Sequence, residues 1–525
     1  MKPIKYSEMK HLSRENPLAY ARFRDHISNQ SAFRGFFMHQ IFLLSFLTIF
    51  TKVPLLGRIS LSIQGLFLGY VVEFNAGKKA KNENLISDKI RFQNAPSQND
   101  FFEHVIIGSG PGAATAALKL INSPKVLILE SGGLPKTPLS EHHTLGHVLN
   151  DFSKSGQEIV LSTWMPQFAQ ANVLGGGSEV NSGLYHRLPE HLVDSLIHAS
   201  SISKERYLDS EQLIQKLLKI SFTSVDQNDS PIFRGATKLN FKSENIPRWR
   251  SYSDDNSYVQ HGMIDLVWQK LASKENFVLS TKSRVVRIDN TNPKKIRISY
   301  FDDNERIREI ECNKLIVAAG TIQTPYILSK SNIIDWSDTR FQWHPMIRTV
   351  ITTRATDLGL HDLDPFQAWT SDKQFKFGSA VSTPGLLAMH LGRILSLDEI
   401  RNLRSLYVSF VSSGRGGLVP GTDTPWYMPS KLDRVRAIEA TKLLREIVLS
   451  GGGTFANKKD EIKKALSTVH VFGSLPLGSS LYLKGTSKLR SDDRIQISDG
   501  SLLPFGPGVN PQAVIMALCN ALVTD

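Results

Sequence analysis

Cysteine is scarce in this chain, and the histidines do not fall at the spacings of metal ligands. Cys312 and Cys519 are the only cysteines in 525 residues, and there is no C-x-x-C pair. Cys312 precedes an apolar strand and Cys519 belongs to a run of small residues typical of a helix, so we expect two unreactive core thiols without a disulfide. Among the 15 histidines, His142 and His143 are adjacent, and adjacent side chains converge poorly on one ion. The sequence therefore predicts no metal site.

Long hydrophobic runs are also missing. The apolar stretches at residues 41–50 and 59–72 fall short of the roughly 20 residues that span a bilayer, and Lys52, Pro54 and Arg58 separate them. The first hundred residues carry fourteen Lys/Arg and seven Asp/Glu, just over half of the net charge of +13. Such a long, charged start is unlike a signal peptide, so we expect a cytoplasmic protein.

Residues 41–72 are open to two interpretations. The favoured one is an amphipathic helical layer packed on the rest of the protein. The alternative is a basic, apolar segment that makes peripheral contact with a membrane surface. The positive charge is not interleaved with stacking aromatics as in a nucleic-acid-binding module, so we expect no nucleic-acid partner.

A dinucleotide-binding start stands at residues 101–133. Residues 105–107 form a short apolar run suited to a buried parallel strand. Gly108, Gly110 and Ala113 then fill the G-x-G-x-x-G/A pattern. The glycines allow a tight turn and a close approach to a pyrophosphate, and the alanine keeps the following helix near the strand.

A second apolar strand, at residues 126–129, ends at Glu130, 22 residues after Gly108. A carboxylate at this place accepts hydrogen bonds from ribose hydroxyls. Strand, glycines, helix, strand and acid in this order predict a nucleotide-binding α/β domain. On these residues alone, the nucleotide is NAD or FAD.

Two further segments favour FAD. Residues 171–187, ANVLGGGSEVNSGLYHR, contain three consecutive glycines, where the backbone can lie flat against a planar ligand or a phosphate. Residues 314–328, KLIVAAGTIQTPYIL, predict a strand that runs into a helix. This second crossing can approach the same cofactor.

A histidine and an asparagine near the end of the sequence point to alcohol oxidation by hydride transfer. His470 lies in VHVFGSLPLG at 469–478, and Asn510 lies in DGSLLPFGPGVNPQ at 499–512. Both stand on turns punctuated by Gly and Pro. A fixed imidazole can take the hydroxyl proton while a fixed amide hydrogen-bonds the same oxygen.

These segments together resemble the glucose-methanol-choline (GMC) oxidoreductase family of FAD flavoproteins, and they follow the family's order along the chain. The resemblance extends over roughly residues 100–525, with a divergent middle. The chain departs from the family at Leu477, where a methionine is usual. The matching segments are GSGPGA at 108–113, LESGG at 129–133, NVLGGGSEVN at 172–181, AAGTIQTPYIL at 318–328, HVFGSLPLG at 470–478 and DGSLLPFGPGVNPQ at 499–512.

The resemblance implies roles for individual residues. It makes His470 the catalytic base and Asn510 the second catalytic residue, and it places Val286 near the adenine. Val180 stands where members that tether their flavin have a histidine, and its side chain has no nucleophilic atom, so we expect non-covalent FAD. The expected cofactor contacts are Gly108, Gly110, Ala113, Glu130, Gly175, Gly176, Ser178, Asn181, Val286, Asp499, Gly500 and Pro511.

The implied fold is α/β, with a Rossmann-like FAD-binding domain, a discontinuous α+β substrate-binding domain and a helical N-terminal extension. The length of the chain also calls for more than one lobe. The expected division is 1–99 for the extension, 100–190, 275–335 and 465–525 for the FAD-binding domain, and 191–274 and 336–464 for the substrate-binding domain. His344 begins a strand of the substrate-binding domain, and we interpret it as a structural histidine.

The expected function is FAD-dependent oxidation of an alcohol, sugar or sterol-like hydroxyl, with O2 or another acceptor taking the electrons. Two alternatives stay open. One is a GMC-type chemistry without net oxidation, such as a lyase or decarboxylase reaction. The other is a redox-silent flavin-binding protein.

Overall fold

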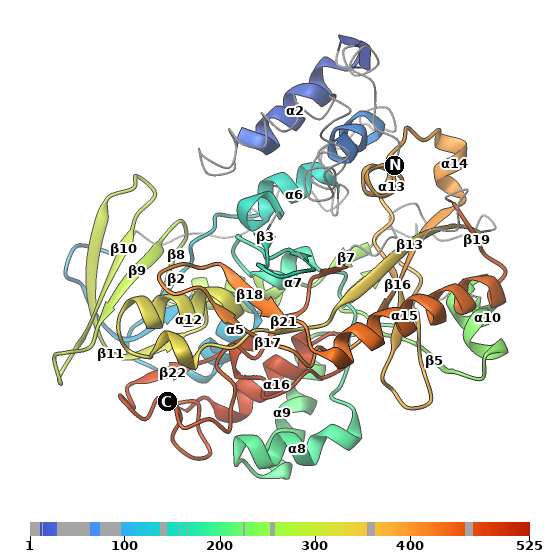
Figure 1. Ribbon diagram of the computed structural model, residues 1–525. Helices are drawn as coiled ribbons and strands as arrows, with labels where there is room; N and C mark the ends of the chain where they lie inside the picture. The colour runs from blue at the N-terminus through green and yellow to red at the C-terminus, as the bar shows by residue number, and fades with distance from the viewer. Residues whose placement is uncertain are drawn as a thin grey trace.

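The computed structural model describes residues 11–12, 14–28, 64–73, 96–136, 144–156, 158–164, 166–223, 226–252, 258–353, 363–456 and 466–524. His142, His143 and residues 41–63 lie outside these ranges. The described chain is built around two sheets, one at each side of the view in Figure 1, with helices on and between them.

The first sheet has seven strands, and its central part is parallel. β8 (Phe277–Ser280), β2 (Val126–Leu129), β1 (Phe101–Ile107) and β11 (Ile307–Val317) lie side by side in this order. All four run in the same direction, and β22 (Ile495–Ile497) adds a fifth parallel strand against the end of β11. Their apolar side chains are buried because helices cover the sheet, as is usual for parallel strands.

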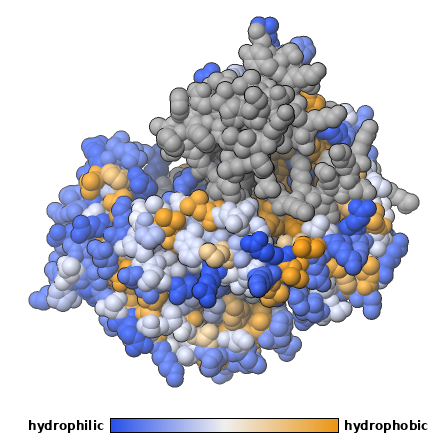
Figure 2. All heavy atoms as spheres, viewed as in Figure 1, coloured by the Kyte–Doolittle hydropathy of each residue, from blue (hydrophilic) through white to orange (hydrophobic). Residues whose placement is uncertain are grey.

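β11 pairs parallel with β1 and β22 and antiparallel with β10 (Ile296–Phe301). Its first half pairs with β10, which pairs in turn with β9 (Arg284–Asp289). Residues 281–283 connect β8 to β9, and there the chain leaves the parallel sheet and enters this antiparallel hairpin. Hydrophilic side chains prevail over the hairpin at the left of Figure 2.

Helices α5 (Pro111–Lys119) and α16 (Gln512–Leu522) pack together beside the parallel sheet. α5 follows the glycine turn directly and is made of small residues, which lets it lie close to the strands. A side chain on Gly112 would come within 2.0 Å of the carbonyl oxygen of Ser498. This close approach holds the segment after β22 against α5, from which it is separated by 386 residues in sequence.

The second sheet has nine strands and is largely antiparallel. Its strands in order are β3 (Glu158–Ile159), β4 (Gln167–Phe168), β20 (Leu466–Thr468), β13 (Met346–Thr352), β16 (Leu403–Ser409), β15 (Lys376–Ala380), β14 (Phe366–Trp369) and β5 (Lys242–Asn245), with β19 (Thr454–Phe455) beside β13.

One face of this second sheet is covered by α10 (Pro231–Lys238) and the long α15 (Lys431–Ser450). Side chains alternate between faces along a strand, so Ile347, Phe377 and Val408 point to these helices and join their apolar core. The residues next to them in sequence point the other way, toward the first sheet.

The apolar cores divide the chain differently from the expected domains in three places. Helices α8 (Glu190–Ser200) and α9 (Lys204–Leu217) and residues 263–272 share the core of the parallel sheet, although we expected them in the substrate-binding domain. Strands β3 and β4 and strand β20 join the second sheet instead of the first. Sequence order did not reveal these crossings because they depend on which apolar faces meet.

The described part of the N-terminal region is helical. α2 (Pro17–Ser28) and the helix at residues 64–73 pack together above the rest of the molecule in Figure 1. The 64–73 helix lies close to α13 (Pro384–Leu391). A side chain on Gly69 would come within 2.8 Å of the carbonyl oxygen of Gly385, so glycine allows this approach.

The apolar side chains of residues 66–68 and 70–72 are buried. For this part of the 41–72 segment, the structure therefore has the packed helical layer and leaves those side chains no free apolar face for a membrane. No helix among the described ranges is both long and apolar enough to cross a bilayer.

The remaining described elements connect these layers. They are α6 (Leu145–Asp151), η3 (Ser153–Gly156), α7 (Gly177–Val180), η4 (Gln227–Asp229), β6 (Arg250–Tyr252), β7 (Tyr258–Gln260), η5 (Ile264–Trp268), α11 (Gln269–Ala272), α12 (Gly320–Lys330), η6 (Trp336–Asp338), β12 (Gln342–Trp343), α14 (Leu397–Arg401), β17 (Arg415–Leu418), β18 (Pro425–Met428), β21 (Val471–Phe472) and η7 (Gly500–Leu502).

Candidate active site

The carboxyl ends of the parallel strands meet at one edge of the first sheet, where dinucleotides bind in open α/β folds. Gly108 follows β1, Glu130 follows β2, and residues 318–320 follow β11 at this edge. Gly108 has a φ of 98°, and a side chain there would come within 2.3 Å of the carbonyl oxygen of Ala318. The turn therefore requires glycine.

The N-terminus of α5 is open to a ligand. Gly110 is its N-cap, no side chain caps the helix, and a Cβ on Gly110 would meet no atom within 4 Å. Helix N-termini of this kind offer unpaired N–H groups and a favourable dipole to a phosphate. Ala113, one turn on, is fully buried against the sheet.

Glu130 is buried directly beside the glycine turn. Its Oε2 accepts a hydrogen bond from the Ser109 N–H at 3.0 Å, and its Oε1 accepts one from the Gly132 N–H at 2.7 Å. Burial raises the pKa of this carboxyl, and these hydrogen bonds act in the opposite direction. The carboxylate is thus fixed where the ribose of a bound dinucleotide is expected.

The glycine-rich segment lies against the same turn. Gly176 has a φ of 58°, and a side chain there would come within 2.8 Å of Gly110 Cα. Ser178 Oγ donates to the carbonyl oxygen of Gly175 at 2.8 Å. Asn181 Nδ2 donates to Gln512 Oε1 at 2.6 Å, which ties this segment to the start of α16 beside Pro511.

Asp499 joins the ends of β22 and β11. Its Oδ1 accepts from the Ser501 N–H at 2.8 Å, and its Oδ2 accepts from the Gly320 N–H at 2.9 Å. Burial raises the pKa of its carboxyl, against the effect of these hydrogen bonds. Gly500 begins η7 directly after it.

Val286 lies in β9, three residues after Ser283, whose N–H donates to the carbonyl oxygen of Glu130 at 2.7 Å. Val285 and Arg287 have partners in β10, but Val286 has none in this register. A bulge of this kind leaves backbone groups free of the ladder. The expected cofactor contacts therefore gather around one edge of the first sheet, and the backbone there fits a dinucleotide.

His470 follows β20 and lies between the two sheets. Its N–H donates to Thr468 Oγ1 at 2.9 Å, and its carbonyl oxygen accepts from the His344 N–H at 3.1 Å. These backbone bonds hold the imidazole in place. Burial lowers the pKa of His470 well below its usual value, and His344, Lys376, His186 and Arg348 add to this effect.

His344 is 3% exposed and stands beside His470. Its Nε2 accepts from the Gly508 N–H at 3.3 Å, and the Nδ1 atoms of the two histidines lie 3.5 Å apart. Burial lowers the pKa of His344 to about 3, assisted by Lys376. We expected a structural histidine, and the structure adds that it contacts the proposed base.

Asn510 lies before α16, and its Oδ1 accepts a hydrogen bond from Lys376 Nζ. With its oxygen engaged in this way, its Nδ2 is the atom left to donate to a ligand. Lys376 begins β15, is 3% exposed, and has its pKa lowered to about 7 by burial.

Sequence reasoning missed Lys376, Arg348, His186, Gln367 and Tyr407. His186 Nε2 lies 2.8 Å from Gln367 Oε1, and Gln367 Nε2 donates to Tyr407 Oη at 3.5 Å. Burial lowers the pKa of His186 well below its usual value. Alternation in QFKFGSA would direct Lys376 to solvent, and only the packing of the two sheets shows that both faces are buried.

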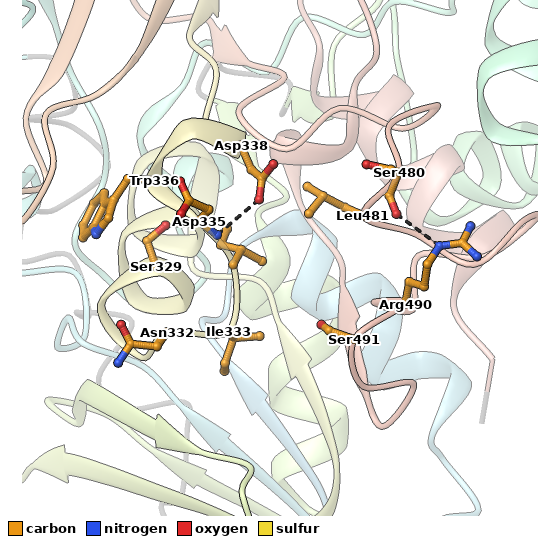
Figure 3. A pocket seen from close by; sticks show the side chains of 11 residues that line it. Ser329, Asn332, Ile333, Asp335, Trp336, Asp338, Ser480, Leu481, Arg490 and Ser491 are labelled. Atoms are coloured by element: carbon orange, nitrogen blue, oxygen red, sulfur yellow. Dashed lines mark hydrogen bonds between the residues drawn. The ribbon is translucent and has the colours of Figure 1, made fainter.

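The hollow in Figure 3 is a different feature, with a volume of about 530 Å³. It lies between the end of α12 and the 480–491 loop, where Arg490 Nε donates to the carbonyl oxygen of Ser480. None of the predicted site residues lines it. Charged groups and polar contacts gather instead around His470 and His344. Cys312 and Cys519 are buried and free, and the described ranges contain no cluster of three metal-ligating side chains.

Comparison with known proteins identifies the fold and the family. The profile of the GMC oxidoreductase family matches residues 127–346. An uncharacterised GMC-type oxidoreductase, y4nJ, of Sinorhizobium fredii is 23% identical over 79% of this chain and 92% of its own length. This chain belongs to the GMC oxidoreductase family.

Other known proteins are similar to parts of this chain or to its fold. The long-chain-alcohol oxidase FAO4A of Arabidopsis thaliana is 24% identical over 44% of this chain and 34% of its own length. An (R)-mandelonitrile lyase-like protein of the same plant is 25% identical over 51% of this chain and 52% of its own length. The crystal structure of pyridoxine 4-oxidase from Mesorbium loti superposes with a TM-score of 0.63, at 15% identity, over 80% of this chain and 98% of that one.

Proposed function

We propose that this GMC oxidoreductase oxidises the CH–OH group of a small-molecule alcohol with non-covalently bound FAD. The observation that supports the proposal is that Lys376 contacts Asn510 and also acts electrostatically on His470, which links the two residues from separate segments. Bound FAD would supply the hydride acceptor of the oxidation. The residues at the edge of the first sheet would hold it, with Gly110 and the start of α5 at the pyrophosphate and Glu130 at the ribose.

In this proposal His470 takes the hydroxyl proton of the substrate. Its lowered pKa keeps the imidazole neutral near pH 7, so a ring nitrogen has a lone pair for this proton. The 3.5 Å contact with His344 is at the outer limit of a hydrogen bond, and a substrate hydroxyl can replace it.

Asn510 orients the same substrate oxygen. Lys376 occupies the oxygen of its amide, which directs the remaining Nδ2–H group toward the substrate. An amide donor stabilises the negative charge that develops on the oxygen as the proton leaves. The arrangement separates the two tasks, since the imidazole accepts the proton and the amide donates to the oxygen.

Anaerobic photometry tests the proposal. A substrate alcohol mixed with the FAD-containing protein should bleach the flavin absorbance, and His470→Ala should slow this bleaching by about 10²–10⁴-fold, the usual share of a positioned general base. His191→Ala is the matched control, because His191 is exposed on α8. Unchanged bleaching in H470A would remove the base from this position. Turnover of a cyanohydrin without bleaching would instead favour the lyase chemistry named for the mandelonitrile lyase-like relative.

A further inference from the structure

Two cations face the proposed site from the second sheet. Lys376 is 3% exposed, and Arg348 is half-buried with a buried Nε. Lys376 and Arg348 point away from the helix-covered face, because Phe377 and Ile347 beside them pack against α10 and α15. Tyr407 pairs with Arg348 across β13 and β16 and shares their face. Both cations act on His470 and lower its pKa, so both lie within electrostatic reach of the proposed base.

Neither cation has an acidic partner among the described residues. Among the described residues, Lys376 Nζ donates only to Asn510 Oδ1, which leaves two of its three donors for a ligand. Arg348 Nε is buried without a hydrogen-bond partner in the described ranges, and one of its terminal nitrogens meets only Met346 Sδ, at 4.0 Å. Buried guanidinium donors without an oxygen acceptor are costly, and a ligand that supplies one removes the cost.

The buried acids Glu158, in β3, and Asp364, just before β14, are engaged elsewhere. Glu158 forms an ion pair with Lys154 at 3.2 Å. Asp364 accepts from Ser230 Oγ at 2.6 Å and from the Phe366 N–H at 2.9 Å, and it interacts electrostatically with Arg234 and Arg404. Besides burial, the largest effects on the pKa of His470 come from His344, Lys376, His186 and Arg348, and all four lower it.

The reaction itself would add to this positive charge. When His470 accepts the hydroxyl proton, a third positive group forms close to Lys376 and Arg348. An anion bound between these groups would offset the repulsion, because opposite charges attract strongly in a site from which water is excluded.

We infer that the substrate is an alcohol that also carries a carboxylate, and that Lys376 and Arg348 bind this carboxylate. The inference rests on the proposed function and specifies its substrate class as hydroxy acids. The contact between Lys376 and Asn510 sets the carboxylate close to the reacting hydroxyl. The carboxylate takes no part in bond making: the hydroxyl proton would pass to His470, and the carbinol hydrogen with its electron pair would leave as hydride to bound FAD, as in the proposed function.

Pairs of compounds that differ only in charge test the inference. Mandelate against mandelamide, and 4-hydroxybutyrate against 4-hydroxybutyramide, keep the hydroxyl and the shape but remove the negative charge. The rate constant for anaerobic flavin reduction, divided by the half-saturating concentration, should favour the acid of a pair by about 10- to 100-fold, as a charge-assisted hydrogen bond gives. Equal values for acid and amide would overturn the inference and leave alcohol oxidation standing.

Variants then connect the preference to the two cations. Lys376→Met and Arg348→Met should each reduce the ratio of acid to amide by about tenfold or more. The ratio cancels effects common to both compounds, including any disturbance of Asn510. Lys373→Met is the matched control, since it removes the same charge from an exposed lysine three residues away and should keep the ratio. If K376M slowed acid and amide equally, the cation would serve the reaction and not the substrate, and the inference would be wrong.

A binding measurement keeps the two proposals separable. Calorimetric titration of the FAD-containing protein with benzoate and hexanoate, which have no hydroxyl to oxidise, should show binding in the wild type and about tenfold weaker binding in R348M. Carboxylate binding without flavin reduction by any hydroxy acid or alcohol would sink the proposed function and keep the anion site. Absence of carboxylate binding, with neutral alcohols still oxidised, would overturn the anion site and keep the proposed function.

Discussion

Replacing Lys376 by methionine should stabilise the protein at neutral and mildly acidic pH. Methionine keeps the length of the side chain and removes a charge that is 3% exposed. Burial lowers the pKa of this ammonium from 10.5 to about 7. A pKa difference of this size corresponds to about 5 kcal/mol, because each pH unit is worth about 1.4 kcal/mol. Loss of the hydrogen bond to Asn510 reduces this expected stabilisation by about 1 kcal/mol.

The sign of this effect changes with pH in a defined way. The unfolded lysine keeps its proton up to about pH 10.5, whereas the folded one loses it above about pH 7. Between these values the unfolded state binds more protons, so the stability of the wild type rises with pH. Below pH 7 both states are protonated and the burial cost is complete. The advantage of K376M should therefore be largest at pH 6–7 and shrink by about 1.4 kcal/mol per pH unit toward pH 10.

Thermal unfolding at pH 6.5, 8 and 9.5 measures this trend. K376M should unfold at a higher temperature than the wild type at pH 6.5, and the difference should narrow at each step. Lys373→Met serves as the control, because Lys373 is exposed and should give a small difference at all three values. A gap that stays constant with pH, or a K376M protein that is less stable at pH 6.5, would mean that the ammonium is solvated or paired in the folded protein.

Two further predictions concern the other proposed site residues. Asn510→Ala should slow flavin reduction by about tenfold, because one oriented hydrogen bond is lost. Asn510→Asp should slow it more, because a carboxylate lacks the N–H donor and repels the developing alkoxide. Equal rates for N510A and the wild type in stopped-flow photometry would contradict the assigned contact. Acid precipitation should release yellow flavin into the supernatant. The buried Val180 side chain cannot form a bond to the flavin, and Glu179 is a weak nucleophile. Fluorescent flavin on the denatured chain in a gel would show a covalent link.

Local sequence determined the glycine turn and the strands around it. Gly108 has a positive φ, Gly110 begins a helix with an open N-terminus, and Glu130 follows a strand. Each of these features depends on neighbouring residues in the sequence. The same holds for the apolar strands. β2 has the predicted bounds, whereas β1 and β11 begin earlier in the chain than the runs predicted at 105–107 and 314–328. The family resemblance rested on these segments, and the comparisons confirm the family.

Tertiary structure decided the surroundings of His470. His344 and Arg348 lie more than a hundred residues from His470 in sequence, and Lys376 lies more than ninety residues from it. No spacing in the sequence therefore brings these neighbours together. The structure also buries Lys376, which its sequence context would place in solvent. A lysine between two phenylalanines in a strand would face water if one face of the sheet were exposed, but here both faces are covered. Whether a charge is buried depends on how two sheets pack, and that is a property of the folded chain alone.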